Sequence, residues 1–168
     1  NKTMAALSVL EEAMEINPNS AEVCSNLGNT LHELGRLDEA EASCRRAIDL
    51  KPNLPDAHNN LGLTLKALGR LDEAEAGYNQ AIALKPDFAE SYNNLGLTLK
   101  DVGRLDEAEA SYHQAIALRP NFAEAYNNLG VTLRKLGRLG EAEASYKQAI
   151  ALKPDFANAH SNLGNTLQ

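Results

Sequence analysis

A line of asparagine residues is the feature of this sequence best suited to binding a ligand. Five of them recur every 34 residues, each two positions before a glycine: Asn26, Asn60, Asn94, Asn128 and Asn162. Three of these follow a second asparagine, at Asn59, Asn93 and Asn127. A side-chain amide offers two donors and one acceptor, the groups that a peptide bond also presents. The line is therefore predicted to hold an extended peptide backbone with little dependence on the peptide's sequence.

Two other interpretations of this line need no ligand. The amides could form hydrogen bonds between neighbouring helices, or they could recur only because the repeats were copied recently. Copied repeats are not independent evidence for a function. We favour ligand binding for the asparagine directly before each Leu-Gly pair, and less so for the asparagine that precedes it.

Two lines of charge have the same 34-residue spacing. The basic line is Lys66, Lys100 and Arg134, and the acidic line is Glu22, Asp56, Glu90 and Glu124. Either line could hold a charged ligand. Acids near the start of a helix and bases near its end also oppose the helix dipole, and we favour this structural interpretation.

The sequence gives little support for catalysis or metal binding. Paired acids such as Asp72 and Glu73 recur once in a repeat at the polar start of a helix, which is typical of a solvated face and not of acid–base catalysis. The histidines lack partners at metal-ligand spacing, and the glycines occur singly, without a phosphate-binding loop. We predict a non-catalytic chain with no metal ion and no cofactor.

Charge and hydropathy narrow the range of partners. The net charge of −7 disfavours nucleic acid, because duplex binding depends on Lys and Arg that neutralise phosphates. No apolar run approaches the about 20 residues that cross a bilayer, and acidic residues interrupt the start of the chain, where a signal peptide would be apolar. We expect a soluble, cytoplasmic protein, excerpted from a longer one, with no nucleic-acid or membrane partner.

Cys24 and Cys44 are predicted to be reduced, buried thiols.

Prolines and glycines divide the chain into pairs of helices. The prolines that close a helix recur every 34 residues, at Pro18, Pro52, Pro86, Pro120 and Pro154. Midway between them come glycines that can end a helix in the left-handed conformation, at Gly35, Gly69, Gly103 and Gly137. Each repeat is therefore predicted to hold a first and a second helix, with Asp72 and Asp106 accepting backbone N–H groups where the second helix starts. Gly140 replaces this aspartate in one repeat, which predicts a frayed start.

Small residues recur with the same 34-residue spacing as these prolines and glycines. A glycine lies inside each first helix, at Gly62, Gly96 and Gly130, and alanines recur in each second helix. A larger side chain at these glycines would overpack the core, so we predict that they let the two helix backbones approach closely. Cysteine, histidine or leucine replaces the repeated tyrosines near both ends of the chain, at Leu10, Cys24, Cys44, His58 and His160. These replacements predict looser packing there.

The pattern resembles the tetratricopeptide repeat (TPR). In one repeat it is carried by Tyr92, Leu95, Gly96, Leu99, Ala108, Tyr112, Ala115 and Pro120. The resemblance implies an all-α fold, a right-handed superhelical solenoid of antiparallel helix pairs with about ten helices, whose first helices line a concave groove. One array would comprise a partial repeat over 1–20, four repeats over 21–54, 55–88, 89–122 and 123–156, and a partial repeat over 157–168.

The asparagine line is also similar to the asparagine ladder in the repeat domain of O-linked N-acetylglucosamine transferases. Together the two resemblances imply a scaffold that binds an extended peptide or a partner helix in its groove. An alternative is the substrate-recognition arm of a larger group-transfer enzyme, such as a glycosyltransferase. A third is a spacer that self-assembles head to tail through its terminal partial repeats.

Overall fold

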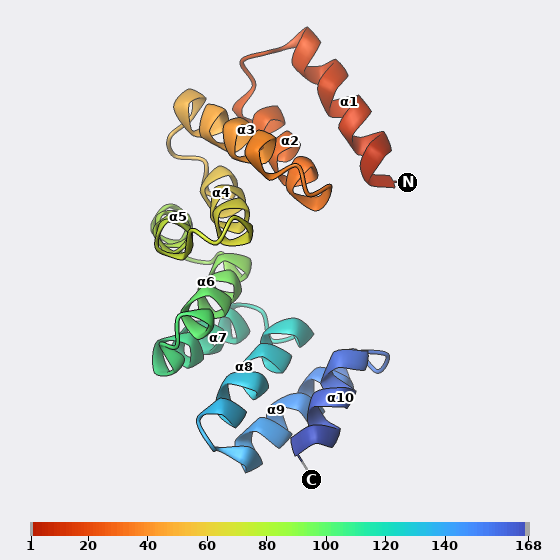
Figure 1. Cartoon of the computed structure of the whole chain (residues 1–168), viewed down its shortest axis with the longest axis vertical. Helices are drawn as coiled ribbons and strands as arrows, with labels where there is room; N and C mark the ends of the chain where they lie inside the picture. Colours follow the sequence, from red (N-terminus) through yellow and green to blue (C-terminus); the bar gives the residue numbers. More distant parts are fainter. Residues whose placement is uncertain (1, 167–168) are drawn as a thin grey trace. The chain divides into compact units, whose positions relative to one another are not determined.

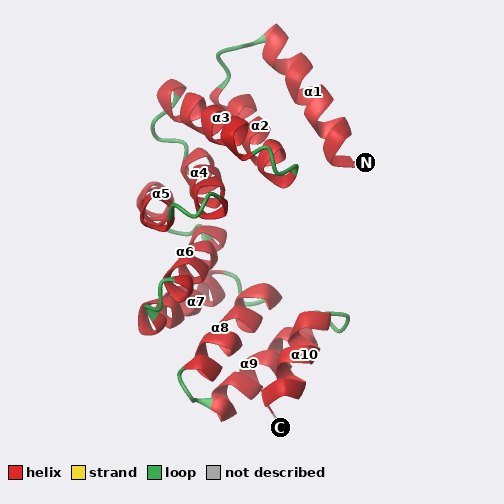
Figure 2. Cartoon of the chain, viewed as in Figure 1, coloured by secondary structure: helices red, strands yellow, loops and turns green. Residues whose placement is uncertain are grey.

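The computed structural model describes residues 2–166, and this part of the chain consists of ten α-helices joined by short loops, without a strand (Figures 1 and 2). Its first helices, which open each repeat, are α2 (Ala21–Glu33), α4 (Pro55–Ala67), α6 (Ala89–Asp101), α8 (Ala123–Lys135) and α10 (Ala157–Thr166). Its second helices are α1 (Lys2–Ile16), α3 (Leu37–Leu50), α5 (Leu71–Leu84), α7 (Leu105–Leu118) and α9 (Leu139–Leu152). The predicted all-α class of repeated helix pairs is confirmed.

The chain forms two compact halves, Asn1–Pro86 and Asp87–Gln168. In the N-terminal half each first helix packs on the second helix of its repeat, α2 on α3 and α4 on α5, and α4 also contacts α3 and α2. In the C-terminal half α6 packs on α7 and α8 on α9, while α8 and α10 each contact the first helix before them. A single continuous array of repeats across both halves stays a prediction.

The first helices end as the sequence predicts. The four glycines after them have positive φ angles, 74° at Gly35, 79° at Gly69, 84° at Gly103 and 78° at Gly137. At the end of α2 the N–H of Gly35 donates to His32 O at 2.9 Å, and the N–H of Arg36 donates to Leu31 O at 2.9 Å. These two hydrogen bonds satisfy carbonyl groups that otherwise have no partner at a helix end. Because glycine adopts a positive φ angle without strain, the chain reverses there into the second helix.

The start of the second helices differs from the prediction. Arg70 directly precedes α5 and no side chain caps the helix; Asp72 lies at its second position, where it can act only through the helix dipole. The carboxylate that is engaged there is Glu73, which accepts from the Arg70 guanidinium at 2.7 and 2.6 Å. Helix α9 begins at the equivalent position although Gly140 replaces the aspartate. The predicted capping role of Asp72 and the predicted frayed start of α9 are both wrong. An arginine before the helix and a glutamate in its first turn form an ion pair that organises this turn in α5 and in α9.

The recurring glycines of the first helices make room for a ring that the sequence did not predict, in addition to the predicted close approach of the helices. A Cβ atom at Gly62, Gly96 or Gly130 would lie 2.6 to 2.7 Å from the Cε1 atom of a tyrosine ring on the second helix of the same repeat. These rings belong to Tyr78, Tyr112 and Tyr146, each 0 % exposed. The glycine therefore makes room for a ring. In the repeat of Gly62 the helices also approach closely, as predicted, because a Cβ at Gly77 of α5 would lie 3.3 Å from Gly62 Cα.

In the first full repeat Cys44 takes the place of the tyrosine, and here the helices do approach closely. A Cβ at Gly28 would collide with Cys44 Sγ and would lie 3.2 Å from Ala40 O and 3.3 Å from Cys44 N. The looser packing predicted for this repeat is not found at this contact, because the Cys44 side chain is 0 % exposed and lies directly against Gly28. Cys24 and Cys44 are free and buried, as predicted, and burial raises the pKa of the Cys44 thiol to about 12.

Neighbouring repeats are also joined by arginines that are not predicted from the sequence. Arg70 donates to Glu41 of the preceding repeat at 2.8 Å, and Arg138 pairs with Glu109 in the same way at 2.6 Å. Burial raises the pKa of Glu41, but hydrogen bonds from Arg45 and Arg70 outweigh it and hold that pKa below its ordinary value. In the sequence these ion pairs correspond to a Gly-Arg pair whose arginine comes 29 residues after a glutamate.

Within the described residues no helix has the length and apolar character to cross a membrane.

Candidate functional site

The asparagines of the first helices bond to the preceding first helix. In the N-terminal half the Asn60 amide donates to Ser25 Oγ at 3.1 Å and to Ser25 O at 3.3 Å. In the C-terminal half Asn128 donates to Asn93 Oδ1 at 3.0 Å. Asn162 donates to Asn127 Oδ1 at 2.9 Å. The amides therefore stabilise the contact between first helices, as one of the structural interpretations predicted.

The two asparagine lines have different surroundings. Asn59, Asn93 and Asn127 are buried, with 6 to 7 % of their surface exposed, and the last two are the acceptors of these bonds. The following asparagine is half-buried at Asn60, Asn94, Asn128 and Asn162. An amide has two N–H groups and an oxygen, so a half-buried asparagine can bond to its neighbour with one group and present another to a ligand.

Asn128→Ala tests the structural role of these amides. The change leaves the buried Asn93 oxygen without its donor, so we expect the free energy of unfolding to fall by about 1–2 kcal/mol. The measurement is urea denaturation followed by circular dichroism. A matched change on a second helix, the exposed Asn79→Ala, should alter stability by less than about 0.5 kcal/mol. Equal effects of the two changes would mean that the amide bond contributes nothing.

Asn26 is the exposed member of the line and lies at a cavity. The cavity has a volume of about 280 Å³ and is lined by Glu22, Ser25, Asn26, Leu54 and Asp56. Its walls come from α2, the start of α4 and the residue before it. It combines an amide, two carboxylates and the buried Ser25 hydroxyl with one apolar wall, which suits a peptide segment and not an apolar small molecule.

The acidic line is largely paired within its own repeats. Glu22 accepts from Lys51 at 2.7 Å, and this hydrogen bond lowers the pKa of the Glu22 carboxyl. Glu90 pairs with Arg119 and Glu124 with Lys153 in the same way, so a base at the end of the second helix meets the acid at the start of the first. These pairs favour the structural interpretation of the acids.

The basic line lies in the last turn of the first helices. Lys66, Lys100 and Arg134 are half-buried at the ends of α4, α6 and α8. Lys100 lies 3.4 Å from the carboxylate of its neighbour Asp101. Their place fits the dipole argument, and a role in ligand binding stays a prediction.

Other chemistry is sparse in the part of the chain that the structure describes. No group of three or more His, Cys, Asp or Glu residues there could hold a metal ion. His58 Nε2 lies 2.8 Å from Pro52 O and His160 Nε2 lies 2.9 Å from Pro154 O, so both rings contact the loop before their helix. The expectation of a non-catalytic chain stays a prediction.

Models of known protein families match the chain, and they agree with this architecture of paired helices. A tetratricopeptide-repeat model matches residues 87–155, a TPR-repeat model matches residues 28–69 and 63–103, and another tetratricopeptide-repeat model matches residues 1–46. A search of curated protein sequences returned no significant match. The helix pairs and the matching models together define the class, and the chain belongs to the tetratricopeptide-repeat family.

Solved TPR structures are similar over most of the chain. TTC0263, a thermophilic TPR protein in Thermus thermophilus, is 27 % identical with a TM-score of 0.87, over 98 % of this chain and 90 % of that one. MamA is 26 % identical with a TM-score of 0.77, over 92 % of this chain and 91 % of that one. YrrB, described as a TPR protein with an unusual peptide-binding site, is 25 % identical with a TM-score of 0.73, over 96 % and 83 %. The narrower resemblance to O-linked N-acetylglucosamine transferases stays a prediction.

Proposed function

We propose that the chain is a protein-interaction scaffold whose first helices bind an extended peptide. The observation that carries the proposal is the cavity beside Asn26, the one exposed asparagine of the 34-residue line within the described residues. The half-buried asparagines at the same position of α4, α6, α8 and α10 extend the same chemistry in each half. A relative described as having a peptide-binding site supports a ligand of this kind.

Peptide main chain is the ligand chemistry that this face fits best. The side-chain amides match peptide groups in both donors and acceptors. Most acids along the face already have a cation from their own repeat. We therefore expect affinity to come from many weak, repeated contacts to the peptide backbone and not from one charged anchor.

Asn26→Ala is the variant that separates binding from stability. Peptides are first selected from a displayed random library against the whole chain, and the dissociation constant is then measured by calorimetry. We expect Asn26→Ala to weaken binding about tenfold, equivalent to one lost hydrogen bond. Its melting temperature should stay near that of the parent, because Asn26 is exposed.

Asn79→Ala is the matched control, since Asn79 is an exposed asparagine on the second helix α5. It should leave the dissociation constant unchanged. Equal losses in the two variants, or no loss in Asn26→Ala, would contradict binding through the first helices. The alternative of a recognition arm in a group-transfer enzyme would use the same face and stays a prediction.

A second candidate function is head-to-tail self-association of the 168-residue chain. Helix α1 is a second helix with exposed apolar side chains, 64 % at Val9 and 85 % at Ile16. Their equivalents in α9, Ser145 and Leu152, are buried and half-buried. Helix α10 is a first helix in which a Cβ at Gly164 would meet nothing within 4 Å, unlike the ring-covered glycines of α4, α6 and α8. The α1 helix of one copy could therefore pack on the α10 helix of another as α9 packs on α8.

Sedimentation over a wide range of concentrations tests this contact. We expect the average mass to rise with concentration, because the exposed apolar faces would be buried. Val9→Glu should reduce the rise by placing a charge in the contact. A mass that stays at one chain throughout would contradict self-association.

A further inference from the structure

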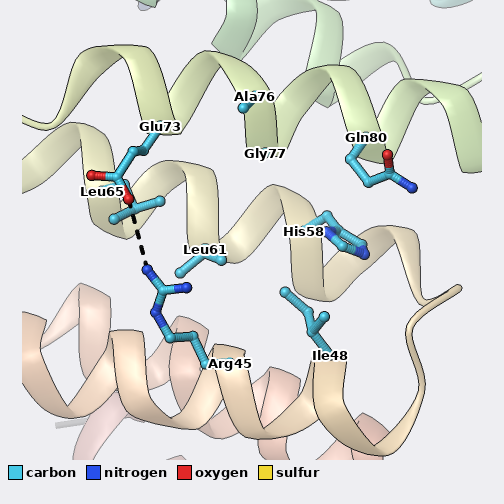
Figure 3. A pocket seen from close by; sticks show the side chains of 9 residues that line it. All are labelled: Arg45, Ile48, His58, Leu61, Leu65, Glu73, Ala76, Gly77 and Gln80. Atoms are coloured by element: carbon cyan, nitrogen blue, oxygen red, sulfur yellow. Dashed lines mark ion pairs between the residues drawn. The ribbon is translucent and has the colours of Figure 1, made fainter.

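A larger cavity, of about 350 Å³, lies where α3, α4 and α5 meet within the N-terminal half (Figure 3). Its apolar surface comes from Ile48 of α3, Leu61 and Leu65 of α4, and Ala76 of α5. It shares no lining residue with the cavity beside Asn26. The chain thus has a second concave site, on the side of the second helices.

Two replacements distinguish this cavity from the same place in the two later full repeats. Gly77 stands where later repeats have Ser111 and Ser145, and His58 stands where they have Tyr92 and Tyr126. Both replacements remove side-chain volume from the lining. A Cβ at Gly77 would also lie 3.1 Å from His58 O, so the glycine lets α5 lie close against α4.

The rim of the cavity is polar but its charges already have partners. Arg45 and Glu73 form the ion pair that is dashed in Figure 3, with a separation of 3.8 Å. Arg45 also pairs with Glu41 at 2.7 Å, and Glu73 pairs with Arg70 at 2.6 Å. An uncharged occupant therefore fits the cavity better than an ionic one, because no cation or anion at the mouth lacks its counter-charge.

The opposite side of the rim offers neutral hydrogen-bonding groups. Pro52 O can only accept, so His58 Nε2 carries the proton that it donates there, and in the neutral ring Nδ1 is an acceptor. The amide of Gln80 adds donors and an acceptor. The apolar centre of the cavity therefore matches one apolar side chain of a ligand. The hydrogen-bonding groups beside it match the two peptide groups that flank that side chain.

We propose that this cavity binds an aromatic or branched aliphatic side chain of a partner protein, presented on an extended or turn segment. Its volume is at the lower end of the about 300–1,000 Å³ typical of ligand pockets, which suits one side chain and not a large cofactor. The occupant is neutral, since Arg45 and Glu73 are paired to residues of this chain. The site is separate from the proposed peptide site on the first helices.

Methyl NMR of the whole chain tests this proposal with N-acetyl-L-phenylalaninamide as the probe. We expect saturable shifts of the Ile48, Leu61 and Leu65 methyl groups, with a dissociation constant on the order of 1 mM for so small a ligand. N-acetylglycinamide, which lacks the side chain, should cause no saturable shift. The equivalent methyl groups of Ile116, Leu129 and Leu133 report, in the same spectrum, on a repeat that carries the tyrosine and the serine.

Variants that restore the sequence of the other repeats complete the test. His58→Tyr with Gly77→Ser should weaken probe binding at least about tenfold, and His58→Tyr alone, which leaves the α4–α5 contact at Gly77 intact, should do the same. Retained binding in His58→Tyr would overturn the proposal. Equal shifts at the two sets of methyl groups, or none at Ile48, Leu61 and Leu65, would also overturn it.

Discussion

Tyr112→Ala is expected to lower the free energy of unfolding by about 4 kcal/mol. The ring is 0 % exposed and fills the space above Gly96 between α6 and α7. Removing a fully buried aromatic ring loses its burial and leaves a cavity, and such changes cost about 3–5 kcal/mol. Chemical denaturation followed by circular dichroism measures the loss.

Tyr112→Phe is the matched control for this prediction. The Tyr112 hydroxyl is buried without a hydrogen-bond partner among the described residues, and burial raises the pKa of the phenol. Removing the hydroxyl should therefore change stability by less than about 1 kcal/mol, or increase it, because a buried polar group without a partner is costly. A loss in Tyr112→Phe as large as in Tyr112→Ala would mean that the hydroxyl, and not the ring, holds the repeat together.

Gly130→Leu is expected to lower the free energy of unfolding by about 2 kcal/mol, within the range for overpacked cores. Even a Cβ at this position would lie 2.6 Å from Tyr146 Cε1. In a Tyr146→Ala background the same change should cost much less, because the ring is gone and the leucine fills part of its place. Denaturation of the parent, both single variants and the double variant gives the coupling energy.

This cycle distinguishes a ring contact from a contact between helix backbones. We expect a coupling of about 1–3 kcal/mol, as for residues that share one space. Additive losses would contradict the ring contact and leave the close approach of the two helices as the reason for the glycine. Gly62 with Tyr78 offers the same pair in the N-terminal half.

The helices could be predicted from sequence because their ends are local. Gly35 and its equivalents require a left-handed backbone, and proline cannot continue a helix, so both mark boundaries without knowledge of the packing. The start of the second helices could not be read as well, because Arg70 acts through two carboxylates, Glu73 and Glu41, of which one belongs to the preceding repeat.

The contacts between repeats were harder to predict, because every candidate partner recurs with the same period. The glycine of the first helix could face a backbone or a ring, and only the structure pairs Gly130 with Tyr146. Likewise Asn128 bonds to Asn93, 35 residues earlier, one residue more than the repeat length. This offset joins the two asparagine lines, and it depends on side-chain direction, which spacing alone does not give.

Asparagines at this position of the repeat therefore have a structural role, shown by their hydrogen bonds, and a binding role that we propose. Asn60, Asn128 and Asn162 stabilise the contact with the preceding first helix, so their removal cannot test binding alone. Asn26 is exposed and has a cavity beside it. It is the position at which binding and stability can be separated.

The most direct test of peptide binding by the first helices is a chemical-shift map of the whole chain with a selected peptide. We expect the largest changes at the Asn26 side-chain amide and at the backbone amides of Glu22 and Asp56, with little change at Asn79. Changes confined to the second helices, or to the residues around Ile48 and Gly77, would contradict peptide binding by the first helices.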